Sequence, residues 1–490
     1  MKKTMQISAS VLLVLSLLLA SLIGTSVNAE PIPTVSLDEW YEQWDNDADL
    51  DAGIVLAPGS DETERYLRWY APADSGEGYV LLSTDADLLN FERFEATFTV
   101  TPENDRSYAA VVTGLAADTT YYYSCRTQTE QSKTYSFKTL ASSDFSAIYV
   151  NDIHVSEDEA DELNIAKQSY TYSTMLDAAL SRNADISIAL SAGDQASEGL
   201  REEYLGLASA PAMKSLSFAG TIGNHDKKGV AYKDFFNYPN EDTQAAVQSY
   251  IGGDYWFVKG NALFLSMDSN NSSMQEHDRF IEEAVSANPD VQWRVLMFHH
   301  ELFGGRIESR EQENELLRIC WTPLMDKYNV DLVLSGHSHY YSISNVMSGK
   351  TTQQSLVGQS SVSNPEGTIY MASGSINRPR SAEDPPLGEN VAFAYLTQEI
   401  IYNIIDFTDT TLTINSYTVE SGECFNTFTI EKTIPQSERE IGKLPFYYSF
   451  VKLLGRIAMM GNNIGRYYDY RTAGLLGNRK FSLSEALMGK

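Results

Sequence analysis

The stretch Phe145-Ser-Ala-Ile-Tyr-Val-Asn-Asp152-Ile-His154 joins an apolar strand to a carboxylate and an imidazole. Asp152 and His154 are separated by one residue, and alternate residues of an extended turn point to the same side. Both side chains can therefore reach one ion. Whether they do depends on what the rest of the chain brings to the same place.

The same arrangement, an apolar strand followed by polar residues, recurs four times. The further motifs are Gly193-Asp194 after 186–190, Gly223-Asn224-His225-Asp226 after 215–222, His299-His300 after 295–298, and Gly336-His337-Ser338-His339 after 330–334. Ligands of open α/β sheets bind beyond the carboxyl ends of the strands. Six of the seven histidines lie in these motifs, and only His277 lies outside them. We therefore expect one shared site.

The residue types of these motifs favour metal ions. Imidazole and carboxylate without thiolate suit Zn, Fe, Mn, Co or Ni. A carboxylate can bridge two cations through its two oxygens. Glycine directly precedes Asp194, Asn224 and His337, which permits tight turns and a close approach of the backbone.

The surrounding sequence indicates two folded regions. Residues 30–140 carry short β-type segments at spacings of roughly ten residues, which indicates an all-β sandwich. Within them Leu115–Tyr121 resembles the corner of a fibronectin type III domain, where a tyrosine hydroxyl ties back to upstream backbone. Residues 141–435 alternate apolar strands with helix-like stretches, expected near 157–182, 275–286 and 311–328, and this alternation predicts a layered α/β domain.

The two ends of the chain differ from both regions. Lys2 and Lys3, the apolar run Val11–Gly24 and the small residues around Ala29 predict a signal peptide over residues 1–29, with an uncleaved anchor as the alternative. A secreted or extracytoplasmic location follows, with attachment to the cell surface as an option. Residues 436–490 carry nine Lys/Arg against four Asp/Glu. This basic, helix-type tail either contacts anionic lipid or cell-wall polymer or, as is commoner, docks on the main domain.

Charge and cysteine content narrow the class of protein. The net charge of −30 argues against nucleic-acid binding, because a phosphate backbone would be repelled over most of the surface. Cys125, Cys320 and Cys424 are widely spaced and cannot all pair, so we expect buried apolar thiols and neither a disulfide scaffold nor a cysteine-ligated metal.

The ordered set of motifs resembles the calcineurin-like metallophosphoesterase superfamily over roughly residues 141–435. The fibronectin-like region in front of it resembles the arrangement in purple acid phosphatases. The resemblance implies an α/β fold: a four-layer αββα sandwich with a binuclear centre, preceded by an all-β fibronectin type III-like sandwich.

Carried over motif by motif, the resemblance assigns each residue a role. Asp152, His154, Asp194 and His339 would hold one metal, and Asp194, Asn224, His299 and His337 the other, with Asp194 bridging. His299 is preferred to His300 as the ligand. His225 would face the substrate phosphate without binding metal, and Asp226 would support it.

One position departs from the purple acid phosphatase pattern. Ser197 stands three residues after Asp194, where those enzymes carry the tyrosine whose phenolate binds iron and gives the colour. His154 is an additional imidazole that those enzymes lack. An imidazole in place of the phenolate predicts a colourless enzyme with two divalent ions of the Fe, Mn, Zn or Co type, and it removes the reason to expect an acid pH optimum.

The expected activity is hydrolysis of small phosphate monoesters by attack of a metal-bridging hydroxide. Phosphodiesters or nucleotides on the same metals are an alternative, because substrate loops vary independently of the fold. A cell-surface binding protein with an inert phosphoesterase domain is an alternative of another class. The natural substrate, the metal identities and the oligomeric state are left open.

Overall fold

The computed structural model describes residues 35–46, 53–156, 164–244, 252–304, 311–379 and 388–477. The predicted signal peptide, residues 1–29, lies outside these residues. Of the helices that are described, none is long and apolar enough to cross a membrane.

The first region is an antiparallel β structure. Its strands are β1 (Val55–Pro58), β2 (Glu64–Ala71), β3 (Gly78–Ser83), β4 (Glu92–Val100), β5 (Arg106–Thr113), β6 (Thr120–Arg126) and β7 (Tyr135–Lys138), in the order β1-β2-β5-β4-β3-β6-β7. Strand β4 pairs with β3 through its first half and with β5 through its second half, so it joins the two halves. Their shared core includes Trp69, Tyr108 and Tyr123. The Tyr121 hydroxyl accepts a hydrogen bond from the Ala116 N–H at 2.9 Å, the tie expected of this corner.

A helix stands within the segment that the sequence predicted to be all-β. Helix α2 (Leu37–Asn46) precedes the first strand, and Trp40 packs edge-on against Tyr170. The expectation of strand structure was wrong here because Ser36 and Glu39 form a reciprocal cap: the Glu39 carboxylate accepts from the Ser36 N–H at 2.8 Å, and the Ser36 hydroxyl accepts from the Glu39 N–H at 3.3 Å.

The second region contains two seven-stranded mixed sheets. The first has the order β10-β9-β8-β21-β22-β23-β18, and its strands are β8 (Phe145–Val150), β9 (Ile186–Ser191), β10 (Ser217–Gly220), β18 (Ser361–Ser363), β21 (Ile401–Phe407), β22 (Thr411–Thr418) and β23 (Cys424–Glu431). The second has the order β11-β12-β13-β14-β19-β15-β20, and its strands are β11 (Tyr255–Lys259), β12 (Ala262–Ser266), β13 (Trp293–Met297), β14 (Leu332–Ser335), β15 (Tyr341–Ser344), β19 (Ile369–Ala372) and β20 (Val391–Tyr395). A small hairpin, β16 (Met347–Ser348) and β17 (Thr351–Thr352), follows β15.

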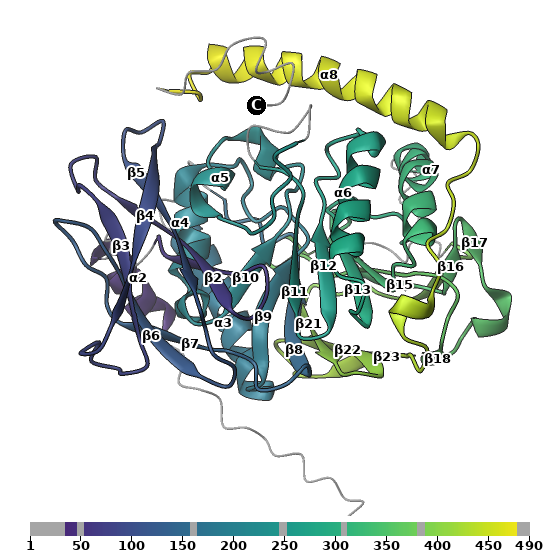
Figure 1. Ribbon diagram of the computed structural model, residues 1–490, viewed down its shortest axis with the longest axis horizontal. Coiled ribbons are helices and arrows are strands. Elements are labelled where there is room, and N and C mark those ends of the chain that lie inside the picture. Colours follow the sequence, from purple (N-terminus) through teal and green to yellow (C-terminus); the bar gives the residue numbers. More distant parts are fainter. Residues whose placement is uncertain are drawn as a thin grey trace, which may run out of the picture. The chain divides into compact units, whose positions relative to one another are not determined.

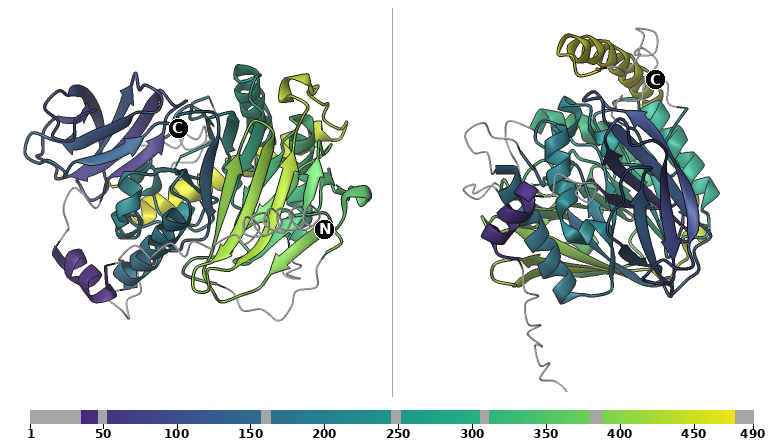
Figure 2. Two further views of the ribbon diagram at one scale, coloured as in Figure 1. Left: turned by 90° about the horizontal axis from the view of Figure 1, so that it is seen from below. Right: turned by 90° about the vertical axis from the view of Figure 1, so that its left-hand side faces the viewer.

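The sheets face each other and helices cover their outer faces, as Figures 1 and 2 show. Between the sheets, Phe145 stacks on Phe407 of its own sheet at 4.6 Å and meets Phe264 of the other sheet at 6.2 Å. Helices α3 (Asn164–Arg182) and α4 (Arg201–Ser209) pack on the first sheet, with the short helix α5 (Tyr232–Phe235) beside them. Helices α6 (Met274–Ala287) and α7 (Glu311–Lys327) pack on the second. The predicted αββα sandwich is confirmed.

Helix α8 (Tyr448–Thr472) follows the last strand. It runs along the top of the molecule in Figure 1, above α5, α6 and α7. Lys452 pairs with Asp278 of α6 at 2.5 Å, and the Tyr448 hydroxyl donates to the Cys320 carbonyl of α7. The helix is thus fixed to the second sheet's helical layer.

The cysteines are all free among the described residues, and they differ in burial. Cys125 is buried and Cys320 is half-buried, but Cys424 is exposed. The expectation of three buried thiols was wrong for Cys424, because it is the first residue of strand β23, and the next two residues of that strand are only half-buried.

Candidate metal centre

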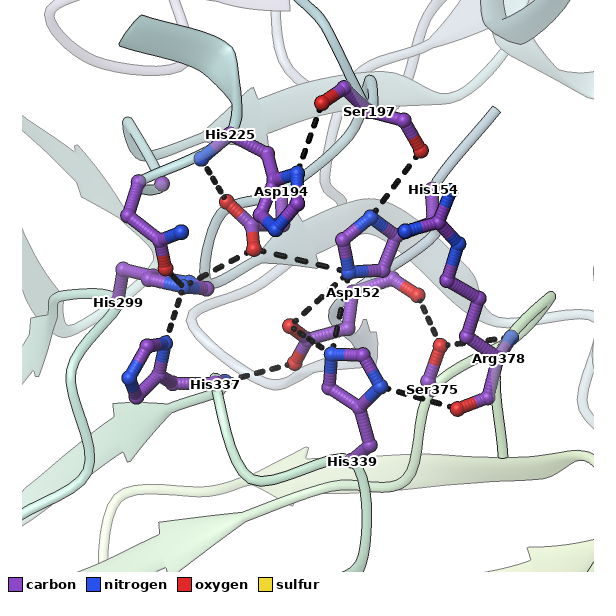
Figure 3. A network of polar contacts seen from close by, with 12 residues as sticks. Asp152, His154, Asp194, Ser197, His225, His299, His337, His339, Ser375 and Arg378 are labelled. Carbon is purple, nitrogen blue, oxygen red and sulfur yellow. Dashed lines mark hydrogen bonds and ion pairs between the residues drawn. The ribbon is translucent and has the colours of Figure 1, made fainter. Parts of the chain in front are cut away.

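The five motifs meet at one end of the two sheets. Strands β8, β9 and β10 are parallel neighbours in the first sheet, and β13 and β14 are parallel neighbours in the second. Parallel neighbours end at the same edge, so the residues that follow them converge. Figure 3 shows the result: side chains from segments 185 residues apart, Asp152 and His337 among them, surround one small space.

The backbone at this place is unusual. Eleven described non-glycine residues have positive φ, and five of them are predicted ligands: Asp152 (49°), His154 (52°), Asp194 (53°), His337 (77°) and His339 (63°). A positive φ strains any residue other than glycine, and the surrounding packing must hold such a residue in place. Residues in this conformation cluster at functional sites. The glycines beside them allow close approach: a Cβ on Gly223 would lie 2.0 Å from Asp194 Oδ1.

The first group of ligand atoms is formed by Asp152, His154, His339 and Asp194. His154 Nε2 lies 3.1 Å from His339 Nε2, and it is 3.7 Å from Asp152 Oδ1 and 3.6 Å from Asp194 Oδ2. His339 Nε2 is 3.3 Å from Asp152 Oδ1. Four potential ligand atoms therefore face a common point.

The second group is formed by Asp194, Asn224, His299 and His337. His299 Nε2 lies 3.2 Å from Asp194 Oδ2, 2.9 Å from Asn224 Oδ1 and 3.2 Å from His337 Nδ1. Asp194 Oδ2 thus lies between the two groups, within 3.6 Å of an imidazole nitrogen of each. Its other oxygen, Oδ1, accepts from the His225 N–H at 2.7 Å and is fixed by it.

The orientation of the imidazoles fits cations. His299 Nδ1 lies 3.0 Å from the Ala192 carbonyl, and His339 Nδ1 lies 3.0 Å from the Arg378 carbonyl, so both rings carry their proton on Nδ1 and turn the lone pair of Nε2 inward. The Nε2 atom of His339 then faces His154 Nε2 at 3.1 Å, and the Nε2 atom of His299 faces Asn224 Oδ1 at 2.9 Å. Two lone pairs at such a distance repel each other unless a cation lies between them.

An unpaired oxygen gives the same indication. Asp152 Oδ2 accepts from the Asn151 amide and from the His337 N–H, the latter at 2.8 Å. Asp152 Oδ1 is buried and, among the described residues, meets no hydrogen-bond donor. Such a group is costly to bury unless it is bound to a metal. The residues present therefore fit a pair of divalent ions.

The pKa shifts in the site follow from burial opposed by neighbouring charge. Burial lowers the pKa of His154 to about 3 although Asp194 and Asp152 oppose it, so this imidazole is neutral and free to bind a cation. Burial would also lower the pKa of His299, but without a metal Asp194 and Asp152 outweigh it and raise the pKa to about 9, so a cation would have to replace the proton on Nε2. Burial would raise the pKa of both carboxyls, but the imidazoles around them hold it below the usual range.

His225 and Asp226 lie at the site in different ways. The His225 ring meets the His154 ring edge-on at 4.8 Å, and its Nδ1 lies 2.7 Å from the Ser197 carbonyl, which leaves Nε2 as the free nitrogen. Asp226 is fully buried, and its carboxylate accepts from the N–H groups of Gly223 and Asp194, both at 2.8 Å.

The expected support of His225 by Asp226 stays a prediction, and the contacts of Asp226 are with other groups. Asp226 also accepts from the Ala196 N–H at 3.1 Å and from the Tyr204 hydroxyl at 2.8 Å. With these four donors it joins the loops that follow β9 and β10, while Ser197 orients the His225 ring. Burial and the charge of Asp194 raise the pKa of Asp226 to about 7.

His300 stands apart from the group around Asp194. Its Nδ1 lies 2.8 Å from the Ser269 hydroxyl, and the His300, Glu313 and His337 side chains each bring one ligand-type atom within 4.8 Å of the others. His300 therefore groups with Glu313 and His337 and not with the ligand atoms around Asp194. The distances favour His299 over His300 for the place next to Asp194.

Arg378 is a residue of the site that the sequence did not indicate. Its carbonyl fixes His339, its N–H donates to Ser375 Oγ at 3.0 Å, and its side chain reaches toward Ser156 Oγ at 3.4 Å. Figure 3 shows the guanidinium on the His154 side of the centre, and its charge contributes to the low pKa of that imidazole. No strand-end pattern marks this position, so only the fold could reveal it.

Comparison with known proteins shows what the two folded regions resemble. Residues 146–341 match the family model of calcineurin-like phosphoesterases. The fold and the donor set agree with this match, so residues 146–341 are similar to metal-dependent phosphoesterases, and the residues of the site fit two divalent ions. Residues 52–139 match the N-terminal domain of purple acid phosphatases, so the chain is more particularly purple acid phosphatase-like, and the resemblance predicted from the motifs is confirmed.

Solved structures show the same fold. A purple acid phosphatase, PPD1, from yellow lupin seeds has a TM-score of 0.65 at 15% identity, over 80% of this chain and 76% of that one. PhoD has a TM-score of 0.50 at 11% identity, over 84% and 98%. Two Mycobacterium tuberculosis proteins, MT2654 and Rv2577, both named as uncharacterised, are 26% identical over 144 residues. The chain spans about a quarter of the length of these curated relatives, at 26% of each.

Proposed function

We propose that the chain is an extracytoplasmic phosphatase that hydrolyses small phosphate monoesters at the centre shared by Asp194. One observation carries the proposal: Asp194 Oδ2 lies between two imidazole groups, 3.2 Å from His299 Nε2 and 3.6 Å from His154 Nε2. A carboxylate oxygen in that place suits two cations held side by side. The apolar run Val11–Gly24 after Lys2 and Lys3 is the ground for export.

When bound, such a pair of cations would supply Lewis-acid polarisation of the phosphoryl oxygens and a hydroxide nucleophile at neutral pH. Asp152, His154 and His339 would hold one, and Asn224, His299 and His337 the other, with Asp194 common to both. The protein's own contribution is to keep these ligands in place before substrate arrives, which lowers the cost of reorganisation.

His225 and Arg378 provide the contacts to the substrate. Because the Nδ1–H of His225 donates to the Ser197 carbonyl, its Nε2 is left to face the phosphoester, where the doubly protonated ring would stabilise charge or give the Nε2 proton to the leaving oxygen. The Arg378 guanidinium adds a second positive group on the His154 side. A monoester dianion carries one more negative charge than a diester, so this cation favours monoesters.

The test combines elemental analysis with a panel of chromogenic mono- and diesters. We expect two metal equivalents per chain and the highest kcat/KM on monoesters. Asp194→Asn should lose metal and turnover together, whereas Glu198→Gln, a change of the same kind at an exposed neighbour, should keep both. The proposal fails if the metal-loaded protein hydrolyses no phosphoester; higher kcat/KM on diesters would instead support the phosphodiesterase alternative.

A further inference from the structure

Helix α8 is apolar on two opposite sides. One side is buried against the molecule through Tyr448, Met459, Asn463, Tyr467 and Tyr470. The opposite side is open to solvent, and its exposed fractions are 63% for Phe450, 55% for Leu453, 49% for Leu454, 58% for Ile457 and 53% for Tyr468. Spacings of three, four, seven and eleven residues place these side chains on one stripe, which we call the outer face of α8.

This concentration of exposed apolar side chains is local. Of the seventeen large apolar side chains that are exposed among the described residues, eight lie between Phe446 and Tyr468. Single exposed apolar residues are ordinary, but a contiguous stripe marks an interaction surface. We propose that the outer face of α8 docks the protein on an anionic lipid bilayer.

Charge selects this partner. Residues 436–490 carry nine Lys/Arg and four Asp/Glu in a chain of net charge −30, so the tail is the part that an anionic surface attracts. Lys443 and Arg456 lie near the first half of the stripe, and Arg471 lies at its end. A second copy would bring two strongly acidic molecules together. An anionic polysaccharide would not cover Phe450 and Ile457, since only an apolar medium gains from their burial.

The buried side of α8 holds the outer face in place relative to the metal centre. The Tyr470 hydroxyl donates to the Lys227 carbonyl, two residues after His225, and Ser272 Oγ donates to the Gly455 carbonyl at 3.0 Å. A Cβ on Gly455 would lie 1.9 Å from the Ser272 carbonyl oxygen, so glycine permits this close contact. Docking therefore brings the loops beside the centre toward lipid. The docking itself is independent of the proposed function; only the use of docking to reach phosphoesters at a membrane rests on that function.

Co-sedimentation with vesicles tests the docking. The probes are anionic phosphatidylglycerol vesicles and zwitterionic phosphatidylcholine vesicles. Parent and variants are all purified as the chain secreted by the same expression host, so that they share the same N-terminus. We expect the parent to bind phosphatidylglycerol vesicles more tightly, and the Phe450→Glu/Leu454→Glu/Ile457→Glu variant to bind them at least roughly tenfold more weakly. Leu89→Glu/Phe91→Glu is the matched control at exposed apolar sites of the β region, 75% and 51% exposed, and should bind like the parent.

The readouts separate docking from folding and from catalysis. The triple variant should keep the unfolding temperature and the turnover of a soluble phosphoester, because its side chains point away from the molecule. Equal vesicle binding by parent and triple variant would overturn the proposal. The proposal would also be overturned if the parent formed a dimer, the triple variant were a monomer, and neither bound lipid. Binding of the parent to soluble cell-wall polymer that the three substitutions leave unchanged would overturn it as well.

Discussion

The Nδ1 atom of His154 lies 3.3 Å from the hydroxyl oxygen of Ser197, and both side chains are buried. Ser197 occupies the position of the iron-binding tyrosine in the purple acid phosphatase pattern, so the imidazole and a small hydroxyl fill the space in which that pattern has a phenolate. We expect iron-loaded protein in air to lack the visible charge-transfer band of tyrosinate–iron(III). An absorption spectrum measures this, and a purple holoprotein would contradict it.

The two adjacent histidines should differ in metal binding. His299 Nε2 lies 3.2 Å from Asp194 Oδ2, whereas His300 Nδ1 lies 2.8 Å from the Ser269 hydroxyl. We expect His299→Ala to lose one of the two metal equivalents and most of the turnover, and His300→Ala to keep both metals. Elemental analysis of variants purified side by side decides it; the reverse result would exchange their roles.

The buried carboxylate of Asp226 should be structural. It accepts three backbone N–H groups and the Tyr204 hydroxyl, so Asp226→Asn turns one acceptor into a donor that faces other donors. We expect the free energy of unfolding to fall by about 1–3 kcal/mol, and Tyr204→Phe to cost less because it leaves three of the four bonds. Denaturant unfolding of the metal-free variants measures this, and an unchanged midpoint for Asp226→Asn would refute the role.

His277, the one histidine outside the motifs, should make the free energy of unfolding fall as pH rises from neutral to alkaline values. Its Nδ1 lies 2.5 Å from Asp254 and its Nε2 lies 2.8 Å from the Asn271 carbonyl, so both nitrogens donate and the ring is protonated. Burial would lower the pKa of His277, but Asp254 outweighs it and raises the pKa to about 9. A raised imidazole pKa means stability that is complete below the ordinary value of 6.5 and is lost as pH rises through 9, by about 3 kcal/mol.

The check is the free energy of unfolding of the parent and of His277→Gln from neutral to alkaline pH. The difference between the two should shrink as pH rises from 6.5 to about 9 and stay constant above it. Curves that stay parallel over that range would show that the ring carries no extra proton in the folded state.

Arg378 should discriminate between substrates by charge. Its guanidinium lies on the His154 side of the centre, and a charge-assisted bond to phosphate contributes about 1.5–3 kcal/mol. We expect Arg378→Gln to lower kcat/KM for a monoester by roughly ten- to a hundredfold and for a diester by less. Arg378→Lys, which keeps the charge but not the planar fork, should lie between. Equal losses on both substrates would remove Arg378 from discrimination.

Some parts of the fold and site could be predicted because their causes are local. Apolar strands that end in Asp152, Asp194, Asn224, His299 and His337 indicate both the layered α/β fold and the place where these side chains gather. Helix α2 was missed, although its Ser36–Glu39 cap is visible in the sequence, because strand-type segments dominate the following hundred residues. Arg378 and the bonds of Asp226 leave no such pattern.

The sequence by itself indicated which residues gather at the centre, because strand ends and residue chemistry are encoded in short segments, and the family resemblance implied that Asp194 is shared by two groups. Only the tertiary structure decided which nitrogen each imidazole turns inward, that the Ser197 carbonyl meets Nδ1 of His225, and that α8 has an apolar face toward solvent. These facts depend on contacts between segments far apart in the chain, such as Tyr470 with Lys227 and His339 with Arg378's carbonyl, and such contacts form only when the sheets and helices pack.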